Sequence, residues 1–110
     1  METSLNNKVA LITGASKGLG LAMAKAYYSH GAKVALLARG PEDLATAEAD
    51  INAMAVTDDY RESAQVKAYA CDVTDAKAIQ ATHQAVVADF GSVDILVNNA
   101  GQSADRKSVV

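Results

Sequence analysis

The fold is decided by residues 8–20, which read KVALITGASKGLG. The first six of these residues form a short, mainly apolar run rich in β-branched side chains, which is typical of a parallel strand buried on both faces. Gly14 ends the run, and a glycine-rich turn leads into residues 18–30, where apolar side chains recur at helical spacing. The stretch therefore predicts a buried strand, a tight turn and a helix in direct succession.

The alternation of strand and helix continues along the rest of the chain. Apolar runs at residues 33–38, 66–71 and 93–97 predict three further buried strands, and residues 56–64 break the periodicity as a polar loop would. Strands that alternate with helices favour a parallel sheet with helices on both faces, joined by right-handed crossovers. We expect an α/β fold with strand order 3-2-1-4.

Three helices are predicted between these strands. The first spans residues 18–30 and is closed by Gly31, the second begins at Pro41, and the third is capped by Thr74 or Asp75. Apolar residues recur in each at helical spacing, so each helix is expected to turn one face to the sheet. These faces comprise Leu19, Ala22, Met23, Ala26 and Tyr27, then Leu44, Ala47, Ile51 and Met54, and finally Ile79, His83, Val86, Val87 and Phe90.

Composition narrows the class of protein. A chain of 110 residues with 50% hydrophobic residues suits one globular domain, and its formal charge of -3 with scattered Lys and Arg argues against a nucleic-acid or anionic-membrane partner. Cys71 is the single cysteine and excludes an internal disulfide, as is typical of the cytosol. The sequence has no signal peptide, no apolar run of membrane-spanning length and no histidine with a metal-ligand partner at the usual spacing. We expect a soluble cytoplasmic protein without a metal site.

The turn after the first strand has the glycine spacing G-x-x-x-G-x-G, formed by Gly14, Gly18 and Gly20. The first glycine permits the tight turn, and the later ones let the backbone approach a pyrophosphate and let helix and strand pack closely. The helix start adds free N–H groups and the positive end of a dipole. A strand-to-helix turn often needs glycine for geometry alone, but its place inside a strand–helix–strand unit favours nucleotide binding.

Three motifs together resemble one family. Residues 13–20 match the T-G-x-x-x-G-x-G of the short-chain dehydrogenase/reductase family, residues 72–73 match its D-V pair, and residues 98–101 match its N-N-A-G. Each motif directly follows a predicted strand, in the family's order, and the resemblance covers residues 8–101. It implies a Rossmann-type doubly wound sheet that holds a nicotinamide dinucleotide at the carboxyl ends of its strands.

The resemblance also implies a role for each motif residue. Those around the pyrophosphate and its ribose would be Gly14, Ser16, Lys17, Gly18, Leu19 and Gly20. Asp72 would accept a hydrogen bond from the adenine amino group while Val73 packs on the ring. Asn99, Ala100 and Gly101 would line the path to the nicotinamide ribose. The alternatives are that Asp72 is an N-cap and that the asparagines make an ordinary turn.

The end of the second strand indicates which nicotinamide cofactor is bound. An acidic residue there would bind the free 2′-hydroxyl of NAD(H), but residues 37–40 read LARG and contain no carboxylate. Arg39 takes that place, and a guanidinium suits a phosphate. Lys17 in the glycine turn can approach the same group. The sequence therefore predicts NADP(H), unless Arg39 is only a solvated residue at a strand end.

The family's catalytic Tyr-x-x-x-Lys pair is missing. None of the four tyrosines, Tyr27, Tyr28, Tyr60 and Tyr69, has a lysine four residues later. We therefore expect no catalytic residue in this chain and no activity from it alone. Residues 1–104 would be a partial NAD(P)-binding domain, with the sheet truncated after the fourth strand. The parent protein would be an NADP(H)-dependent enzyme that reduces a small carbonyl compound or oxidises the alcohol. It would form a homodimer or homotetramer. The alternatives are an NADP(H) sensor without catalysis and an inert product of a truncated gene.

The last six residues, 105–110, have no helical or strand period and nothing to cap or pack. One back-translation of them, followed by a stop codon, resembles a common short-read sequencing adapter. We expect this tail not to be native sequence, although a polar, frayed terminus has the same composition. It is assigned no function. The fourth strand would then be a bare apolar edge, and such edges favour aggregation.

Overall fold

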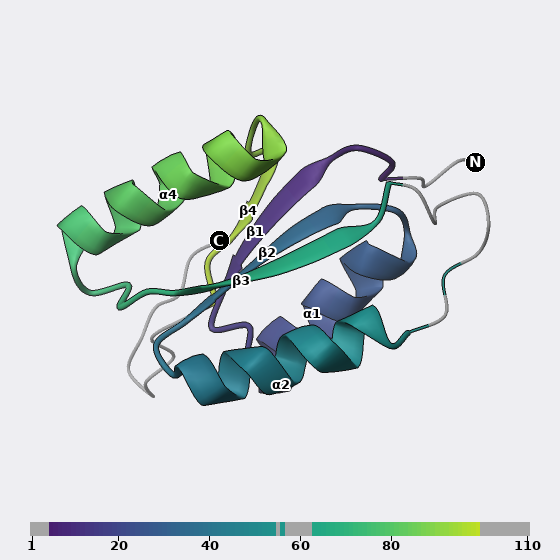
Figure 1. Ribbon diagram of the computed structural model, residues 1–110, viewed down its shortest axis with the longest axis horizontal. Helices are drawn as coiled ribbons and strands as arrows, with labels where there is room; N and C mark the ends of the chain where they lie inside the picture. Colours follow the sequence, from purple (N-terminus) through teal and green to yellow (C-terminus); the bar gives the residue numbers. More distant parts are fainter. Residues whose placement is uncertain (1–4, 55, 57–62, 100–110) are drawn as a thin grey trace.

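The computed structural model describes residues 5–54, 56 and 63–99, so the tail at 105–110 lies outside it. Strands and helices alternate along the described residues, as predicted (Figure 1). The strands are β1 (Val9–Thr13), β2 (Lys33–Ala38), β3 (Gln65–Ala70) and β4 (Ile95–Val97). The helices are α1 (Gly18–Ser29), α2 (Pro41–Asn52) and α4 (Ala76–Phe90). Within these ranges, no helix is long and apolar enough to cross a bilayer.

The four described strands form one parallel sheet in the order β3-β2-β1-β4, which confirms the predicted order. Because every pairing is parallel, the carboxyl ends of the strands meet at one edge of the sheet. β4 begins at Ile95, two residues later than predicted. The carboxylate of Asp94 explains the difference, since its Oδ2 accepts the Val9 N–H at 2.9 Å and takes the donor that a strand carbonyl would use.

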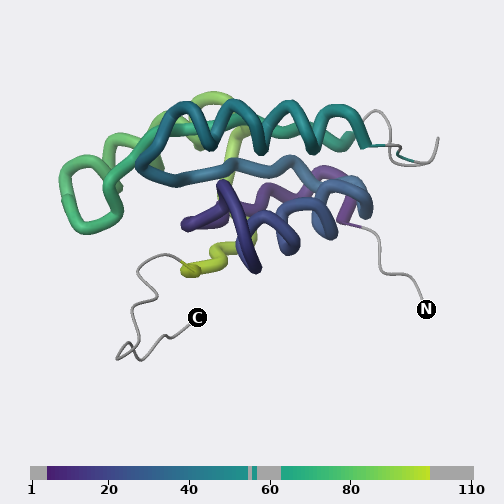
Figure 2. Tube along the Cα trace, turned by 90° about the horizontal axis from the view of Figure 1, so that it is seen from below, coloured from purple at the N-terminus to yellow at the C-terminus, as the bar shows by residue number. Residues whose placement is uncertain are grey.

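α1 and α2 lie next to each other over one face of the sheet and bury the larger hydrophobic core (Figure 2). The predicted face of α2 is confirmed, because Leu44, Ala47 and Ile51 are buried and Met54 packs against them. Their partners on the strands include Ile12, which is fully buried. This layer fixes the start of α2 beside the carboxyl end of β2.

The predicted face of α1 is wrong except at Tyr27, which packs against the larger core. The residues that α1 buries are Gly20, Ala24 and Tyr28, whereas Leu19 is 66% exposed. Of the other predicted positions, Ala22 and Ala26 are exposed and Met23 and Tyr27 are partly buried. Gly20 sets the orientation, because a Cβ there would lie 2.2 Å from the carbonyl oxygen of Gly14. Residues four apart share a helix face, so Ala24 and Tyr28 follow Gly20 onto the sheet and Leu19 turns outward.

On the opposite face, α4 is the only helix in the part of the chain that the structure describes (Figure 1). Asp75, one of the two predicted caps, begins it, since its Oδ1 accepts the N–H groups of Lys77 and Ala78 at 3.0 and 3.3 Å. The predicted buried face is confirmed at Val86. The remaining positions are partly buried at Phe90 and exposed at Ile79, His83 and Val87. A helix with no neighbour beside it leaves its flanks in solvent, which explains the three exposed positions.

Polar contacts attach the C-terminal end of α4 to β3. Asp89 Oδ2 accepts a hydrogen bond from the Tyr69 hydroxyl at 2.6 Å and from Lys67 Nζ at 2.9 Å. These two donors lower the pKa of the Asp89 carboxyl. Burial and the bond to Asp89 raise the pKa of the Tyr69 hydroxyl. We call Lys67, Tyr69 and Asp89 the α4 tether.

Candidate functional site

The carboxyl ends of the strands bring the predicted site residues into one row. Following the sheet order, Asp72 comes after β3, Arg39 after β2, Gly14 after β1 and Asn99 after β4. Neighbouring strands lie about 4.8 Å apart, so the row extends over roughly 14 Å. An elongated ligand that lies across these ends would meet the four groups in that order.

Thr13 joins the ends of β1 and β4 in this row. Its side chain is buried, and its Oγ1 accepts the Asn99 N–H at 2.7 Å. The same oxygen lies 3.3 Å from Asn98 Oδ1 and 3.4 Å from the Val97 carbonyl, to which its hydroxyl can donate. Asn99 Nδ2 in turn donates to the Gly14 carbonyl at 3.5 Å. Thr13 was not among the predicted site residues, although a hydroxyl at the end of a buried strand is a signal for such a bridge.

The glycine turn is shaped by two different demands. Gly20 is required by packing, because a Cβ there would meet the Gly14 carbonyl and would lie 2.8 Å from Asn99 Nδ2. Gly18 has a φ of +63° and nothing within 4 Å of where its Cβ would project. Such a φ favours glycine. The turn therefore presents bare backbone to open space at the start of α1, as a phosphate site needs.

The start of α1 differs from the starts of the other two described helices. No side chain caps α1, and its first turn holds no acidic residue. In contrast, Asp75 caps α4, and the first turn of α2 contains Glu42 and Asp43. The N–H groups and the positive dipole end of α1 are therefore left for an anion from outside the helix. This arrangement can bind phosphate.

Asp72 and Arg39 face each other across the ends of β3 and β2. Asp72 Oδ1 accepts from the Thr74 hydroxyl at 2.7 Å and from the Thr74 N–H at 3.0 Å. These two bonds lower the pKa of the Asp72 carboxyl, and the nearby Arg39 guanidinium lowers it further. Because Asp75 is the N-cap of α4, the alternative that Asp72 is the cap does not hold. Asp72 is thus held as a charged acceptor beside a cation.

The structure places a carboxylate near the end of β2, where none was predicted. Residues 37–40 lack an acid, but Asp43, three residues into α2, lies with its Oδ2 3.8 Å from Lys17 Nζ. The same oxygen lies 3.7 Å from the position of a Cβ on Gly40. The helical turn after Pro41 brings Asp43 back over the end of β2. A search confined to the strand end could not have found it.

The remaining predicted residues lie in different surroundings. Ser16 is partly buried in the turn, whereas Leu19 is exposed. Val73 packs against the smaller core on the α4 side of the sheet, which also contains Cys71, buried as predicted. The predicted positions Ala100 and Gly101 lie outside the described residues.

Tyr69 is a tyrosine close to a lysine, but its environment does not suit proton transfer. A tyrosine that acts as an acid–base catalyst near neutral pH needs a lowered pKa. Burial and the bond to Asp89 have the opposite effect and raise the pKa of Tyr69. Its neighbour Lys67 is committed to Asp89 as well. The pair therefore attaches α4 to the sheet.

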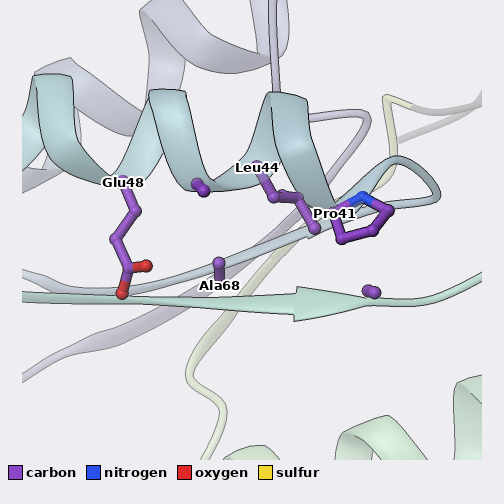
Figure 3. Close-up of a pocket in the computed structure, with 6 residues that line it drawn as sticks. Pro41, Leu44, Glu48 and Ala68 are labelled. Atoms are coloured by element: carbon purple, nitrogen blue, oxygen red, sulfur yellow. The ribbon is translucent and has the colours of Figure 1, made fainter.

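A hollow of about 270 Å³ lies between α2 and β3 (Figure 3). Its lining is mainly apolar, with Leu44 and Ala68 on opposite sides, and Glu48 supplies its single charged group. A carboxylate repels phosphate, so this hollow does not suit the ligand that the strand ends favour. The candidate site is the row of strand ends.

Known proteins resemble this chain in both sequence and structure. The chain is 42% identical over 102 residues to 15-hydroxyprostaglandin dehydrogenase (NAD(+)) of Mus musculus, which covers 93% of this chain and 36% of that relative. L-sorbose reductase from Gluconobacter frateurii, solved with NADPH and L-sorbose, superposes with a TM-score of 0.81 and 34% identity over 97% of this chain and 38% of the reductase. An NAD+-bound xylitol dehydrogenase superposes with a TM-score of 0.78 and 38% identity over 90% of this chain and 35% of that one.

These relatives are longer proteins, named as dehydrogenases or a reductase. The chain spans little more than a third of the length of each. The family model for short chain dehydrogenases matches residues 8–109. Since that match covers nearly all of the chain, the chain belongs to the short-chain dehydrogenase family.

Proposed function

We propose that this chain is the NADP(H)-binding half of an oxidoreductase that interconverts a carbonyl group and an alcohol in a small molecule. The observation that carries the proposal is the start of α1, which has no side-chain cap, no acid in its first turn and bare glycine backbone facing open space. A helix start of this kind attracts phosphate. When bound, the nicotinamide supplies or accepts the hydride.

In this proposal, each residue along the row of strand ends contacts one part of the dinucleotide. The backbone at Gly14 and Gly18 holds the pyrophosphate. Asp72 accepts a hydrogen bond from the adenine amino group, and its lowered pKa keeps it in the accepting, charged form. Asn99 lies at the nicotinamide end, where Thr13 fixes its backbone N–H. The bridge between β1 and β4 thus sets the position of the ribose contact.

The choice of NADP(H) rests on two cations. Arg39 directly follows β2, and Lys17 lies in the glycine turn after β1, the neighbouring strand. A guanidinium donates two parallel hydrogen bonds to a phosphate, and an ammonium adds a point charge. Both cations suit the 2′-phosphate that distinguishes NADPH from NADH. The relatives named above include proteins of both cofactor types, so the proposed choice between NADP(H) and NAD(H) depends on the residues of this chain.

The contribution of this chain to the reaction is binding and orientation. It holds no Tyr-x-x-x-Lys pair, and Tyr69 is engaged in the α4 tether. The groups that move a proton to or from the substrate would have to come from residues beyond those in this chain. The purified chain should therefore bind NADPH without turning over any carbonyl compound.

Removal of Arg39 tests the proposal. In Arg39→Ala, we expect NADPH binding to weaken about 10- to 100-fold, because a hydrogen bond to a charged group contributes about 1.5–3 kcal/mol. NADH binding should change little, since NADH carries no 2′-phosphate. Lys33→Ala is the matched control, because Lys33 is a cation at the opposite end of the same strand. Both affinities are measured by titration with nucleotide fluorescence, and equal losses for NADPH and NADH in Arg39→Ala would refute the assignment.

A further inference from the structure

The ion pair between Lys17 and Asp43 places a negative charge next to the proposed 2′-phosphate site. Lys17 Nζ and Asp43 Oδ2 are 3.8 Å apart, and their side chains are 80% and 63% exposed. Asp43 belongs to α2, and its carboxylate lies over Gly40, directly after Arg39. The carboxylate therefore pairs with one of the two proposed phosphate ligands and lies next to the residue that follows the other.

Lys17 is the proposed partner of the 2′-phosphate and is also paired with the Asp43 carboxylate. When Lys17 pairs with Asp43, less of its charge is available to a phosphate, and the carboxylate itself repels the phosphate. A carboxylate near the end of the second strand is also the group that accepts a hydrogen bond from a free 2′-hydroxyl in NAD(H)-binding sheets. Both effects act in the same direction, against NADPH and toward NADH.

We propose that Asp43 is a specificity-determining residue that restrains the preference for NADPH, so that the site binds both nicotinamide cofactors. The inference rests on the proposed function, since it concerns the same 2′ position. Arg39 and Lys17 favour the phosphate, and Asp43 opposes them from the first turn of α2. The balance between NADPH and NADH is then set by three side chains from three segments, of which the helix residue acts against the other two.

The size of the effect follows from charge and exposure. A phosphate group carries close to two negative charges at neutral pH, and a neighbouring carboxylate repels it by a modest amount in a solvated site. Salt reduces this repulsion further. Removal of the charge should therefore change the ratio of NADPH to NADH affinity about three- to tenfold, and the change should shrink as ionic strength rises.

Asp43→Asn is the direct test, because it keeps the size of the side chain and its ability to accept a hydrogen bond. The 110-residue chain is titrated with NADPH and with NADH, and the ratio of the two dissociation constants is compared between variants. Any change in the folded fraction lowers both apparent affinities by the same factor, so the ratio is unaffected by it. Glu42→Gln is the matched control, since it removes the same charge from the same helical turn.

The expected result is a ratio that moves toward NADPH about three- to tenfold in Asp43→Asn at low salt, and less in Glu42→Gln. A ratio that moves equally in both variants, or does not move in Asp43→Asn, overturns the role of Asp43. If Arg39→Ala still weakens NADPH selectively in that case, the proposed function stands and only this inference fails. If wild-type chain binds neither nucleotide, or Arg39→Ala leaves NADPH binding intact, the proposed function fails, and the role of Asp43 fails with it.

Discussion

The two faces of the sheet differ in how completely they are covered. On the face of α1 and α2, side chains such as Ile12, Leu36 and Ile51 are fully buried. On the face of α4, Val86 is buried, while Ile79 of the same helix is 39% exposed. The first layer has the larger buried core, and the second combines a smaller core with the α4 tether. Both layers contribute residues to the same row of strand ends, so the two halves of the proposed cofactor site are held by different amounts of buried packing.

The difference has a consequence for the site. The glycine turn and Arg39 are fixed by the well-packed layer, since α1 and α2 begin directly after them. Asp72 and Val73, by contrast, lead into α4. Regions with few buried contacts open at lower free energy than a packed core. The adenine end of the proposed site should therefore be the less rigid end.

Matched isoleucine deletions give the largest expected contrast between the faces. Ile51→Ala removes a fully buried side chain from α2 and should cost about 2–5 kcal/mol of unfolding free energy, because it leaves a cavity. Ile79→Ala removes the same atoms from a half-exposed position on α4 and should cost less than about 1 kcal/mol. Urea unfolding monitored by circular dichroism measures both. Equal losses would mean that α4 is packed as tightly as α2.

The α4 tether should make the weaker face sensitive to pH. The pKa of Asp89 is lowered in the fold, so its stabilising contribution is present above the ordinary carboxyl range and is lost as pH falls through the lowered value. The pKa of Tyr69 is raised, so its contribution is present below the ordinary value of about 10 and is lost as pH rises through the raised one. The tether is therefore complete between roughly pH 4 and pH 10.

Asp89→Asn tests the tether at neutral pH. We expect amide hydrogen exchange in α4 to speed up by less than about fivefold, because partly exposed ion pairs contribute little. Exchange in α2 should stay unchanged, which makes α2 the internal control. In the wild-type chain, acid should produce the same selective loss in α4. Equal acceleration in both helices would show that Asp89 supports the whole fold instead of one layer.

Much of this fold follows from sequence patterns, and the failures have identifiable causes. Strand order and the buried face of α2 were predictable, because strands alternate with helices along the chain and the apolar residues of α2 recur at regular helical spacing. The face of α1 was not, since the close approach of Gly20 to the Gly14 carbonyl overrides the apolar pattern. The start of β4 was missed because a side chain, that of Asp94, replaces a backbone acceptor. The first failure comes from a steric contact and the second from a hydrogen bond between residues distant along the chain. The periodicity of apolar residues carries no information on either.

The candidate site divides in the same way. The motif residues at the strand ends were predictable, because parallel strands bring their carboxyl ends to one edge. Thr13 and Asp43 were not assigned, because their importance lies in three-dimensional contacts. Thr13 contacts Asn99 across 86 residues of sequence, and Asp43 contacts Lys17 from another segment. Patterns along the chain therefore predict the ligand class, while the geometry adds the groups that we propose adjust the selectivity.

The smallest expected effect on stability concerns the exposed end of the weaker face. Leu96 in β4 is the register partner of Leu11, so it lies on the α4 side of the sheet, where it is 60% exposed. Among the described strands, β4 pairs with β1 alone and forms one edge of the sheet. An apolar side chain on an edge strand favours pairing with another chain.

Leu96→Lys should lower aggregation measured by light scattering. Because Leu96 is exposed, the substitution should change the free energy of unfolding by less than about 0.5 kcal/mol. Leu19→Lys is the matched control, because Leu19 is a similarly exposed leucine on a helix. If both substitutions reduce scattering equally, general surface hydrophobicity and not the β4 edge drives association; if only Leu96→Lys does, the uncovered end of the α4 face is where chains meet.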